Sequence, residues 1–327
     1  MLSLRLSVVA VAAAAVVAAC GGGGENVVGP PGGPNGGGGQ TPTPVPQRLY
    51  VSDPLQPPNS TAGTIYAFAL PVTASSTPVA VLSGTSFPEH MAFDPTQRLF
   101  VVNGGAMQVF SQPIVSGAAP AFTIAAGEAR SSIAFDAQGN AYFTQCTSFV
   151  FSACYDGEVD VLTAPLSSVS TVQFALTKTA AHQVPFGLAF DKSGNLWVSV
   201  GGLSKPAQLF EYSPPINSAS VVALKFAASQ VGTLAFDAAG NLYIAGASGV
   251  DVYMPPFRAA SSKAFTVPMP HGGDAFAIAF DAAGKAYVSD SNGNIQVFTA
   301  PLSAGSVPVA TLPLALSPTE AGVAIGP

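Results

Sequence analysis

The chain of 327 residues is 48% hydrophobic and only 9% charged, with a formal net charge of −6. A chain of this length can form one large domain with a sizeable core or two small ones, and its low charge content leaves Ser, Thr, Gly, Ala and Pro to cover much of the surface. The eleven Lys and Arg residues are scattered and form no basic run. This distribution disfavours nucleic-acid binding, and we expect no nucleic-acid partner.

Residues 1–19 have the features of an export signal. Arg5 is their only charge, and the apolar stretch at 6–19 has 14 residues, fewer than the roughly 20 that a membrane-spanning helix needs. The stretch runs into the tetrad Val-Ala-Ala-Cys at 17–20, which resembles the lipobox of bacterial lipoproteins. In that family a peptidase cleaves before the cysteine, whose thiol carries a diacylglycerol. The resemblance implies lipidation of Cys20; the alternative is an ordinary signal peptide followed by a chance cysteine.

Residues 20–47 continue from this cysteine as a linker of Gly runs and Pro repeats. Such a composition cannot bury a core and predicts a disordered tether. Residue 21 is Gly rather than Asp, and resemblance to sorted Gram-negative lipoproteins then implies the outer membrane, on its periplasmic or surface side, if the organism has one. We therefore expect a folded head in the bacterial cell envelope, held at a membrane by its lipid anchor.

From residue 48 onward the sequence repeats. A four-residue motif ending in Phe-Asp occurs five times, with 42, 55, 46 and 44 residues between successive Phe positions. After each copy come a polar turn and an alternating apolar run, which is typical of a β-strand. The copies are Met91–Asp94, Ile133–Asp136, Leu188–Asp191, Leu234–Asp237 and Ile278–Asp281.

A proline landmark recurs six times within the same periods, after a further alternating run and before another. Each period of about 45 residues therefore holds four short antiparallel strands, A to D, which is the pattern of a β-propeller blade. We expect the prolines at the C–D turn, beside the outer edge strand, where a missing N–H does least harm. They are Pro71, Pro113, Pro165, Pro215, Pro256 and Pro301.

The mismatch between six prolines and five Phe-Asp motifs predicts how the ring closes. The first blade begins at strand B, Arg48–Val51, and Gly322–Pro327 fits the register of its missing strand A. Residues 48–327 thus predict an all-β, six-bladed propeller in which the last strand pairs with the first three. Closure of this kind removes the free sheet edges of a linear array.

The motif Ala-Phe-Asp-x-x-Gly-Asn-Leu-Tyr/Trp-Val, clearest at 189–198 and 235–244, resembles the NHL-repeat and gluconolactonase-like propeller superfamily. The resemblance implies the fold and no single activity, because that superfamily includes binders, hydrolases and lyases. Gluconolactonase-like enzymes hold a divalent cation through Glu, Asn and Asp near the start of strand A, four residues before the Phe. Glu89 matches, but Phe186 and Gly232 replace the other two ligands. One carboxylate cannot replace three oxygen ligands, so we predict no cofactor, with a channel cation as the alternative.

The repeated Asp residues are interpreted as structural. Each begins a tight A–B turn with Gly following in most copies, where Asp accepts backbone hydrogen bonds and Gly tolerates positive φ. The Phe before each Asp, and Trp197, should pack between neighbouring blades. No Ser, metal, phosphate-loop or Cys-x-x-Cys motif of an enzyme is present in the sequence, and we assign no catalytic residue.

Propeller geometry places the A–B and C–D turns on one face, where they are expected to be short and uniform, and the B–C and D–A loops on the other. The second set varies, notably at 53–63, 145–157 and 201–207. Cys146 and Cys154 could form a disulfide across the longest loop, because the domain is exported; the alternative is two free thiols. Variable loops on a rigid scaffold are where binding usually occurs.

The three histidines lie in D–A loops on alternate blades, but three, eight and nine residues before their Phe landmarks. Three histidines could hold a metal, yet these should lie at different heights, so we predict no metal site. Phe186 and Phe276 instead favour a partly apolar channel mouth for a hydrophobic or aromatic ligand. The candidate mouth residues are Glu89, His90, Glu128, Arg130, His182, Phe186, His271, Asp274, Phe276 and Glu320.

The expected function is that of a non-enzymatic binding or interaction module, monomeric, with a protein, a glycan or a small apolar ligand on the loop face. Two alternatives stay open: a channel-mouth enzyme of lactonase-like or lyase-like type, and a structural component of the envelope.

Overall fold

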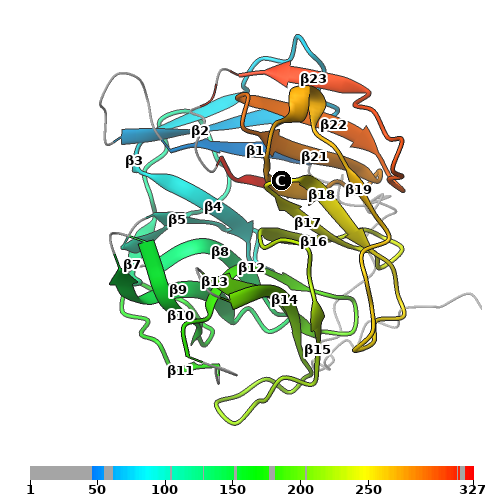
Figure 1. Cartoon of the computed structure of the whole chain (residues 1–327). Helices are drawn as coiled ribbons and strands as arrows, with labels where there is room; N and C mark the ends of the chain where they lie inside the picture. The colour runs from blue at the N-terminus through cyan, green and yellow to red at the C-terminus, as the bar shows by residue number, and fades with distance from the viewer. Residues whose placement is uncertain are drawn as a thin grey trace, which may run out of the picture. The chain divides into compact units, whose positions relative to one another are not determined.

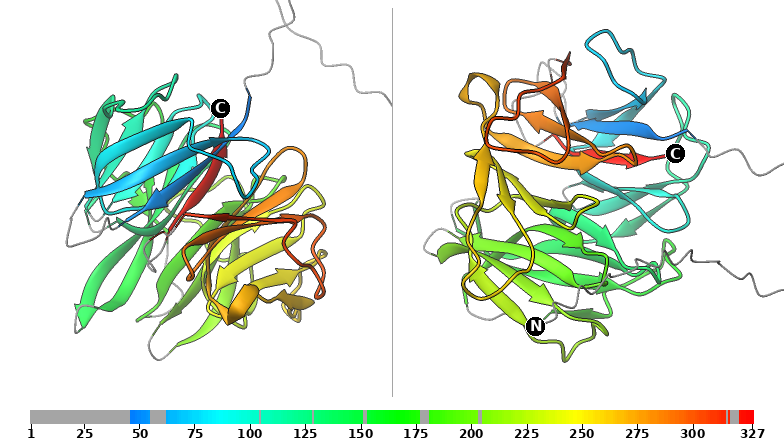
Figure 2. Two further views of the ribbon diagram at one scale, coloured as in Figure 1. Left: turned by 90° about the horizontal axis from the view of Figure 1, so that it is seen from above. Right: turned by 90° about the vertical axis from the view of Figure 1, so that its right-hand side faces the viewer.

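The computed structural model describes residues 46–54, 62–103, 105–127, 129–150, 153–176, 181–202, 205–314, 316 and 321–327. Cys20, the predicted signal peptide and nearly all of the predicted linker lie outside these residues. The described residues form six four-stranded antiparallel sheets, the blades of a β-propeller (Figures 1 and 2). Within these ranges the only helical element is a short 3-10 turn, η1 (Pro270–Gly272), and no helix is long and apolar enough to cross a membrane.

The blades are numbered in chain order, and the A strands of neighbouring blades contact one another in a closed ring. From strand A outward to strand D, the strands are β24 (Val323–Gly326), β1 (Arg48–Asp53), β2 (Ala62–Ala69) and β3 (Ala80–Ser86) in blade 1; β4 (Pro88–Phe93), β5 (Leu99–Asn103), β6 (Ala106–Phe110) and β7 (Phe122–Ala125) in blade 2; β8 (Ala129–Phe135), β9 (Ala141–Val150), β10 (Ala153–Leu162) and β11 (Phe174–Ala175) in blade 3; β12 (Val184–Phe190), β13 (Leu196–Gly202), β14 (Lys205–Tyr212) and β15 (Leu224–Ala227) in blade 4; β16 (Thr233–Phe236), β17 (Leu242–Gly246), β18 (Gly249–Tyr253) and β19 (Phe265–Val267) in blade 5; and β20 (Ala275–Phe280), β21 (Lys285–Asp290), β22 (Asn294–Thr299) and β23 (Ala310–Pro313) in blade 6.

The predicted ring closure is confirmed. Strand β24 pairs antiparallel with β1, with Arg48 opposite Gly326 and Val51 opposite Val323. Figure 2 shows this C-terminal strand beside the blue N-terminal strand. The Tyr50 hydroxyl donates a hydrogen bond of 2.5 Å to the carbonyl oxygen of Pro327. Blade 1 is therefore assembled from both ends of the described propeller.

Aromatic ring pairs join neighbouring blades at five of the six interfaces of the ring, from blade 1 to blade 6, as predicted. The Phe at the end of each A strand from blade 2 to blade 6 packs against the aromatic residue of strand B in the preceding blade, within the buried inter-blade clusters. Such contacts bury large apolar surfaces in a preferred tilted geometry. The ring pairs and their centroid distances are Tyr50–Phe93 (5.1 Å), Phe100–Phe135 (4.8 Å), Tyr142–Phe190 (5.1 Å), Trp197–Phe236 (6.2 Å) and Tyr243–Phe280 (4.9 Å).

The A–B turns of blades 3 to 5 repeat one hydrogen-bond pattern, well illustrated by Asp237. One oxygen of its carboxylate accepts the backbone N–H groups of Ala239 and Asn241, both at 2.9 Å. The other accepts the Asn241 side-chain amide and the Tyr243 hydroxyl, both at 2.8 Å. Burial and this carboxylate raise the pKa of Tyr243, so the phenol remains a donor. The motif Asp-x-x-Gly-Asn-x-Tyr is thus a folding unit, and the structural interpretation of the aspartates agrees with its geometry.

The C–D connections are uniform, as predicted, but they are ten or eleven residues long rather than short. They share one face with the A–B turns, here called the turn face; the B–C and D–A connections form the loop face. The six landmark prolines follow strand C, each after a cis peptide bond. The extra length folds into a turn of its own: the Ser303 N–H donates to Ser306 Oγ at 2.8 Å, and the Ser306 N–H to the Ser303 carbonyl at 3.0 Å.

Two of the predicted loops are largely β-structure instead. Residues 145–150 and 153–157 continue the hairpin of β9 and β10, each ten residues long, with register shifts near Cys154 and Asp156. Residues 201–202 and 205–207 likewise belong to β13 and β14, where Gly202 pairs with Lys205. The prediction was wrong because antiparallel pairing continues past the end of the common blade wherever consecutive residues can keep the ladder. Most of the third predicted loop, 53–63, lies outside the described residues.

Candidate functional site

Local irregularities in the A strands bring side chains to the channel mouth on the loop face. In β12 the residues on either side of Phe186 pair with Val200 and Ser199, so Phe186 itself opposes no partner. The same shift leaves Glu89 unmatched in β4 and Phe276 unmatched in β20. β-Bulges of this kind re-aim a side chain at the rim of a sheet structure. The position four residues before the landmark Phe, selected from the sequence, is therefore a bulge.

Blade 5 has no side chain at this position. Its residue is Gly232, and a Cβ atom there would collide with the carbonyl oxygen of Ala245. A Cβ atom at Gly246, near the end of the neighbouring strand, would likewise collide with the carbonyl oxygen of Val231. Close backbone approach thus requires glycine at both positions. The result is a gap in the ring of mouth residues, flanked by the Phe-bearing blades 4 and 6.

The gap is a cavity of about 220 Å³. Its walls come from four blades, and they combine two phenyl rings with one imidazole, one carboxylate and several small apolar residues. This composition fits the usual ligand site, in which a few polar groups stand in apolar walls. The lining residues are His90, Phe186, Val231, Gly232, Thr233, Ala245, Gly246, Ala247, Asp274, Ala275 and Phe276.

Serine and threonine hydroxyls hold the walls in place. Ser199 Oγ accepts the N–H of Gly187 at 2.9 Å and donates to the Gly232 carbonyl at 2.6 Å, which links blade 4 to blade 5. Thr233 Oγ1 donates to the Phe276 carbonyl at 3.0 Å and links blade 5 to blade 6. These bonds satisfy the backbone groups at the cavity and fix its shape before any ligand arrives. These hydroxyls were not predicted from the sequence, although a strand-B serine recurs in three blades.

His90 enters the cavity from the far side of the ring. The corresponding position is small in every other blade, whereas His90 places an imidazole there, only 9% exposed. Burial lowers the pKa of His90 to about 4, so the ring is neutral at pH 7. A neutral imidazole can donate one hydrogen bond and accept another. The smaller residues at the same position are Ser132, Gly187, Thr233, Ala277 and Gly322.

Asp274 supplies a carboxylate at the cavity edge and is itself exposed. Its backbone is fixed to the B–C turn of blade 6: the Asp274 N–H donates to Ser291 Oγ at 2.9 Å, and the Ser291 N–H donates to the Asp274 carbonyl at 3.0 Å. The carboxylate therefore stands on an anchored segment.

The remaining predicted mouth residues are dispersed. His182 is exposed and stacks on Tyr155 at 4.3 Å, and His271 lies exposed in η1. The structure thus does not bring the three histidines together, and in the described part of the chain no group of three or more His, Cys, Asp or Glu could hold a metal ion. Glu89 is half-buried outside the cavity lining, and its carbonyl accepts the Ser52 hydroxyl at 2.8 Å. Glu128 and Glu320 lie outside the described residues, and the Arg130 side chain in β8 is not described.

Two larger hollows, of about 1060 and 770 Å³, open on the turn face. Phe135, Asp136 and Ala137 line both, so the two hollows lie on either side of the blade 3 turn. They were not predicted, since the turns there are uniform in sequence. They are enclosed between the repeated Asp turns and the long C–D connections.

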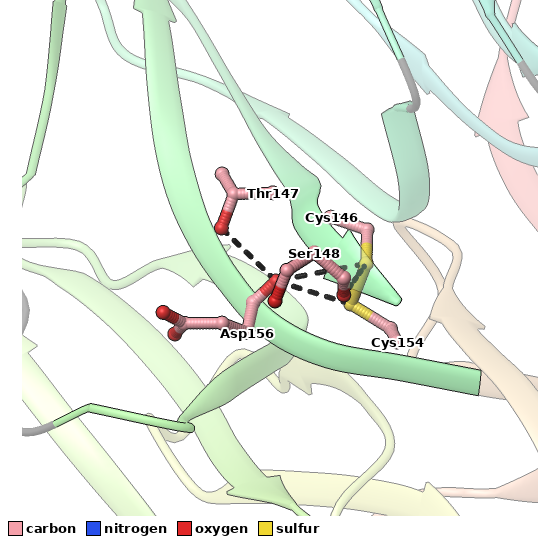
Figure 3. The surroundings of a disulfide bond; sticks show 5 residues. All are labelled: Cys146, Thr147, Ser148, Cys154 and Asp156. Atoms are coloured by element: carbon pink, nitrogen blue, oxygen red, sulfur yellow. Dashed lines mark hydrogen bonds between the residues drawn. A yellow bond between two sulfur atoms is a disulfide. The ribbon is translucent and has the colours of Figure 1, made fainter. Parts of the chain in front are cut away.

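Cys146 and Cys154 form the predicted disulfide (Figure 3). Their Cα atoms are 5.7 Å apart, within the range that a disulfide can span. Beside it, the Thr147 hydroxyl donates to the Asp156 carbonyl at 3.1 Å and joins the two strands once more. The bond therefore reinforces the extended hairpin of blade 3 on the loop face.

No family model matches this chain, and no curated protein matches its sequence. Solved structures share its fold: a protein of unknown function from Bacteroides caccae has a TM-score of 0.54 at 12% identity, covering 86% of this chain and 99% of that one. A functionally unknown protein from Desulfotomaculum acetoxidans has a TM-score of 0.53 at 15% identity, covering 85% and 89%. A gluconolactonase from Xanthomonas campestris has a TM-score of 0.48 at 18% identity, covering 70% and 79%. At such low identities the likeness concerns the propeller fold and transfers no activity.

Proposed function

We propose that this protein is a non-enzymatic ligand-binding module of the bacterial cell envelope, which binds through the channel mouth on its loop face. The observation that carries the proposal is the preformed cavity at blade 5, where Gly232 leaves a gap between Phe186 and Phe276. Its rigid, mostly apolar walls and few polar groups suit a small ligand, or the end of a glycan or peptide. Binding in such a site needs little reorganisation of the protein.

The binding role is tested by a thermal-shift screen of the full chain in detergent against small apolar molecules, glycans and peptides. Hits should stabilise the wild type but lose their effect on the double variant Phe186→Ala, Phe276→Ala. The matched control is Phe149→Ala, which removes an exposed phenyl ring from the blade 3 hairpin. Hits that stabilise the double variant as strongly as the wild type would place binding elsewhere and refute the proposal.

The envelope location rests on the lipobox-like tetrad at 17–20 and the Gly- and Pro-rich segment after it. We propose that Cys20 carries the lipid and that the NHL-like propeller is the exposed head. Metabolic labelling with an alkyne fatty acid should label the wild type and not Cys20→Ser, and the variant should leave the membrane fraction. Equal labelling of both proteins would show that the lipid is absent from Cys20.

The enzyme alternative has its own test. Metal analysis of the purified protein, with calcium and zinc thermal shifts, is expected to find no stoichiometric metal. A stoichiometric ion that is lost in Glu89→Ala or His90→Ala would overturn the binding-only role and favour lactonase-like or lyase-like chemistry at the mouth.

A further inference from the structure

The walls of the mouth cavity specify more than a general ligand site. Phe186 and Phe276 occupy the same bulge position in blades 4 and 6, and the blade between them has only Gly232 there. A ligand in the cavity therefore occupies the place of a missing side chain, between two phenyl rings. Both rings are half-buried, so each keeps part of its surface free for contact.

The charge of the cavity is one-sided. Among the described residues that line it, Asp274 is the only formally charged one, and His90 is uncharged near neutral pH because it is buried. The net charge of the whole chain is −6, so the long-range field also favours a cation over an anion. An anionic ligand would meet a carboxylate there, and no basic side chain among the described lining residues would compensate it.

The kind of cation follows from the remaining groups. A hard metal ion requires six or more oxygen ligands, and the lining offers one carboxylate. Phenyl faces attract a cation that sheds its water easily, and alkylammonium and quaternary ammonium groups are recognised in this way. Resting on the proposed binding function, we infer that the mouth cavity takes a small organic monocation, with its alkylated nitrogen between Phe186 and Phe276 and its charge balanced by Asp274.

The test uses choline and tetramethylammonium as probes, with the full chain in detergent at constant ionic strength. Isothermal titration should give saturable binding with a dissociation constant of about 1 mM or below. The neutral isostere 3,3-dimethylbutan-1-ol has the shape of choline without the charge, and it should bind at least about fivefold more weakly. This comparison needs no variant, so it stands even if a substitution disturbs folding.

Variants locate the site. Phe186→Leu retains apolar bulk but removes the aromatic face, and Asp274→Asn removes the charge; each should weaken choline binding about fivefold. Phe149→Ala should leave it unchanged. Equal binding of choline and its neutral isostere would overturn the inference while leaving the mouth as a binding site.

Absence of choline and tetramethylammonium binding, with a different ligand sensitive to the Phe186→Ala, Phe276→Ala pair, would also overturn the inference and leave the proposed function intact. If every bound ligand, cations included, is insensitive to that pair, both the inference and the proposed function are wrong.

Discussion

The turn face and the loop face of the propeller differ in how far their residues follow the repeat from blade to blade. On the turn face, Asp237 and its counterparts make one hydrogen-bond pattern in successive blades. On the loop face, the position four residues before the landmark Phe carries Glu, Ser, Phe, Gly or Ala, according to the blade. Residues that repeat are bound to one another, whereas some of the residues that differ between blades, such as Phe186 and Phe276, line the cavity. The difference teaches that residues which recur in successive blades build the scaffold, whereas the candidate site is formed by residues that differ between blades.

The largest expected contrast is between two aspartates, one from each face. Asp237→Ala removes four hydrogen bonds of a buried carboxylate and should lower the free energy of unfolding by about 3–4 kcal/mol. Asp274→Ala, at the exposed cavity edge, should change it by less than about 0.5 kcal/mol. Urea unfolding followed by Trp197 fluorescence measures both. Similar losses in the two variants would break the distinction between the faces.

A pH series tests the buried imidazole. The pKa of His90 falls from 6.5 to about 4 on folding, so the unfolded chain binds this proton more tightly. The buried, neutral His90 therefore makes its full contribution to the free energy of unfolding above pH 6.5. This contribution is lost as the pH falls toward 4, which lowers the free energy of unfolding by about 3 kcal/mol at most. Because Glu89 and Asp274 are also ionisable groups, the quantity to measure is the difference between wild type and His90→Ala. That difference should shift by this amount between pH 7 and pH 4; a constant difference would contradict the buried, neutral state.

Removal of the disulfide tests the extended β9–β10 hairpin on the loop face, which is not part of the repeated blade pattern. Its short loop limits the stabilisation to about 2.5 kcal/mol in the chain-entropy model. The double variant Cys146→Ala, Cys154→Ala should lose up to this amount, and amide exchange should increase mainly at the ends of β9 and β10. Uniform acceleration of exchange in all six blades would show instead that the hairpin supports the whole ring.

The smallest effect is expected at the hydroxyl links between blades. Ser199→Ala leaves the Gly187 N–H and the Gly232 carbonyl without their side-chain partner and should cost about 1–2 kcal/mol. Ser193→Ala, in an exposed turn, is the matched control and should stay within about 0.5 kcal/mol. An equal effect in the two variants would remove the hydroxyl link as a reason for the rigidity of the cavity.

Much of the scaffold was predictable because it depends on local, repeated chemistry. The Phe-Asp turns, the proline landmarks and the fit of Gly322–Pro327 to the missing strand predicted six blades and the closing strand correctly. The strands at 145–150 and 153–157 were not predicted, because polar and Gly residues in an extended hairpin look like a loop when their partners are unknown. The length of the C–D connections was also misjudged. These connections are longer than a tight turn because each folds into a turn of its own, such as that at Ser303, which is held by contacts within the connection.

The sequence by itself determined the repeat, the strand order within a blade and the cysteine pair as a candidate disulfide, because each follows from residue type and spacing. The family resemblance also pointed to the position four residues before the landmark Phe as a candidate mouth position. Only the tertiary structure decided which of the candidate mouth residues meet: His90, Phe186, Asp274 and Phe276 line one cavity, whereas His182 stacks on Tyr155 and His271 lies in η1. The physical reason is that these placements depend on contacts between blades. Such contacts determine where a strand bulges, where only glycine fits and how high a residue lies along its strand, and the spacing of residues along the chain does not encode them.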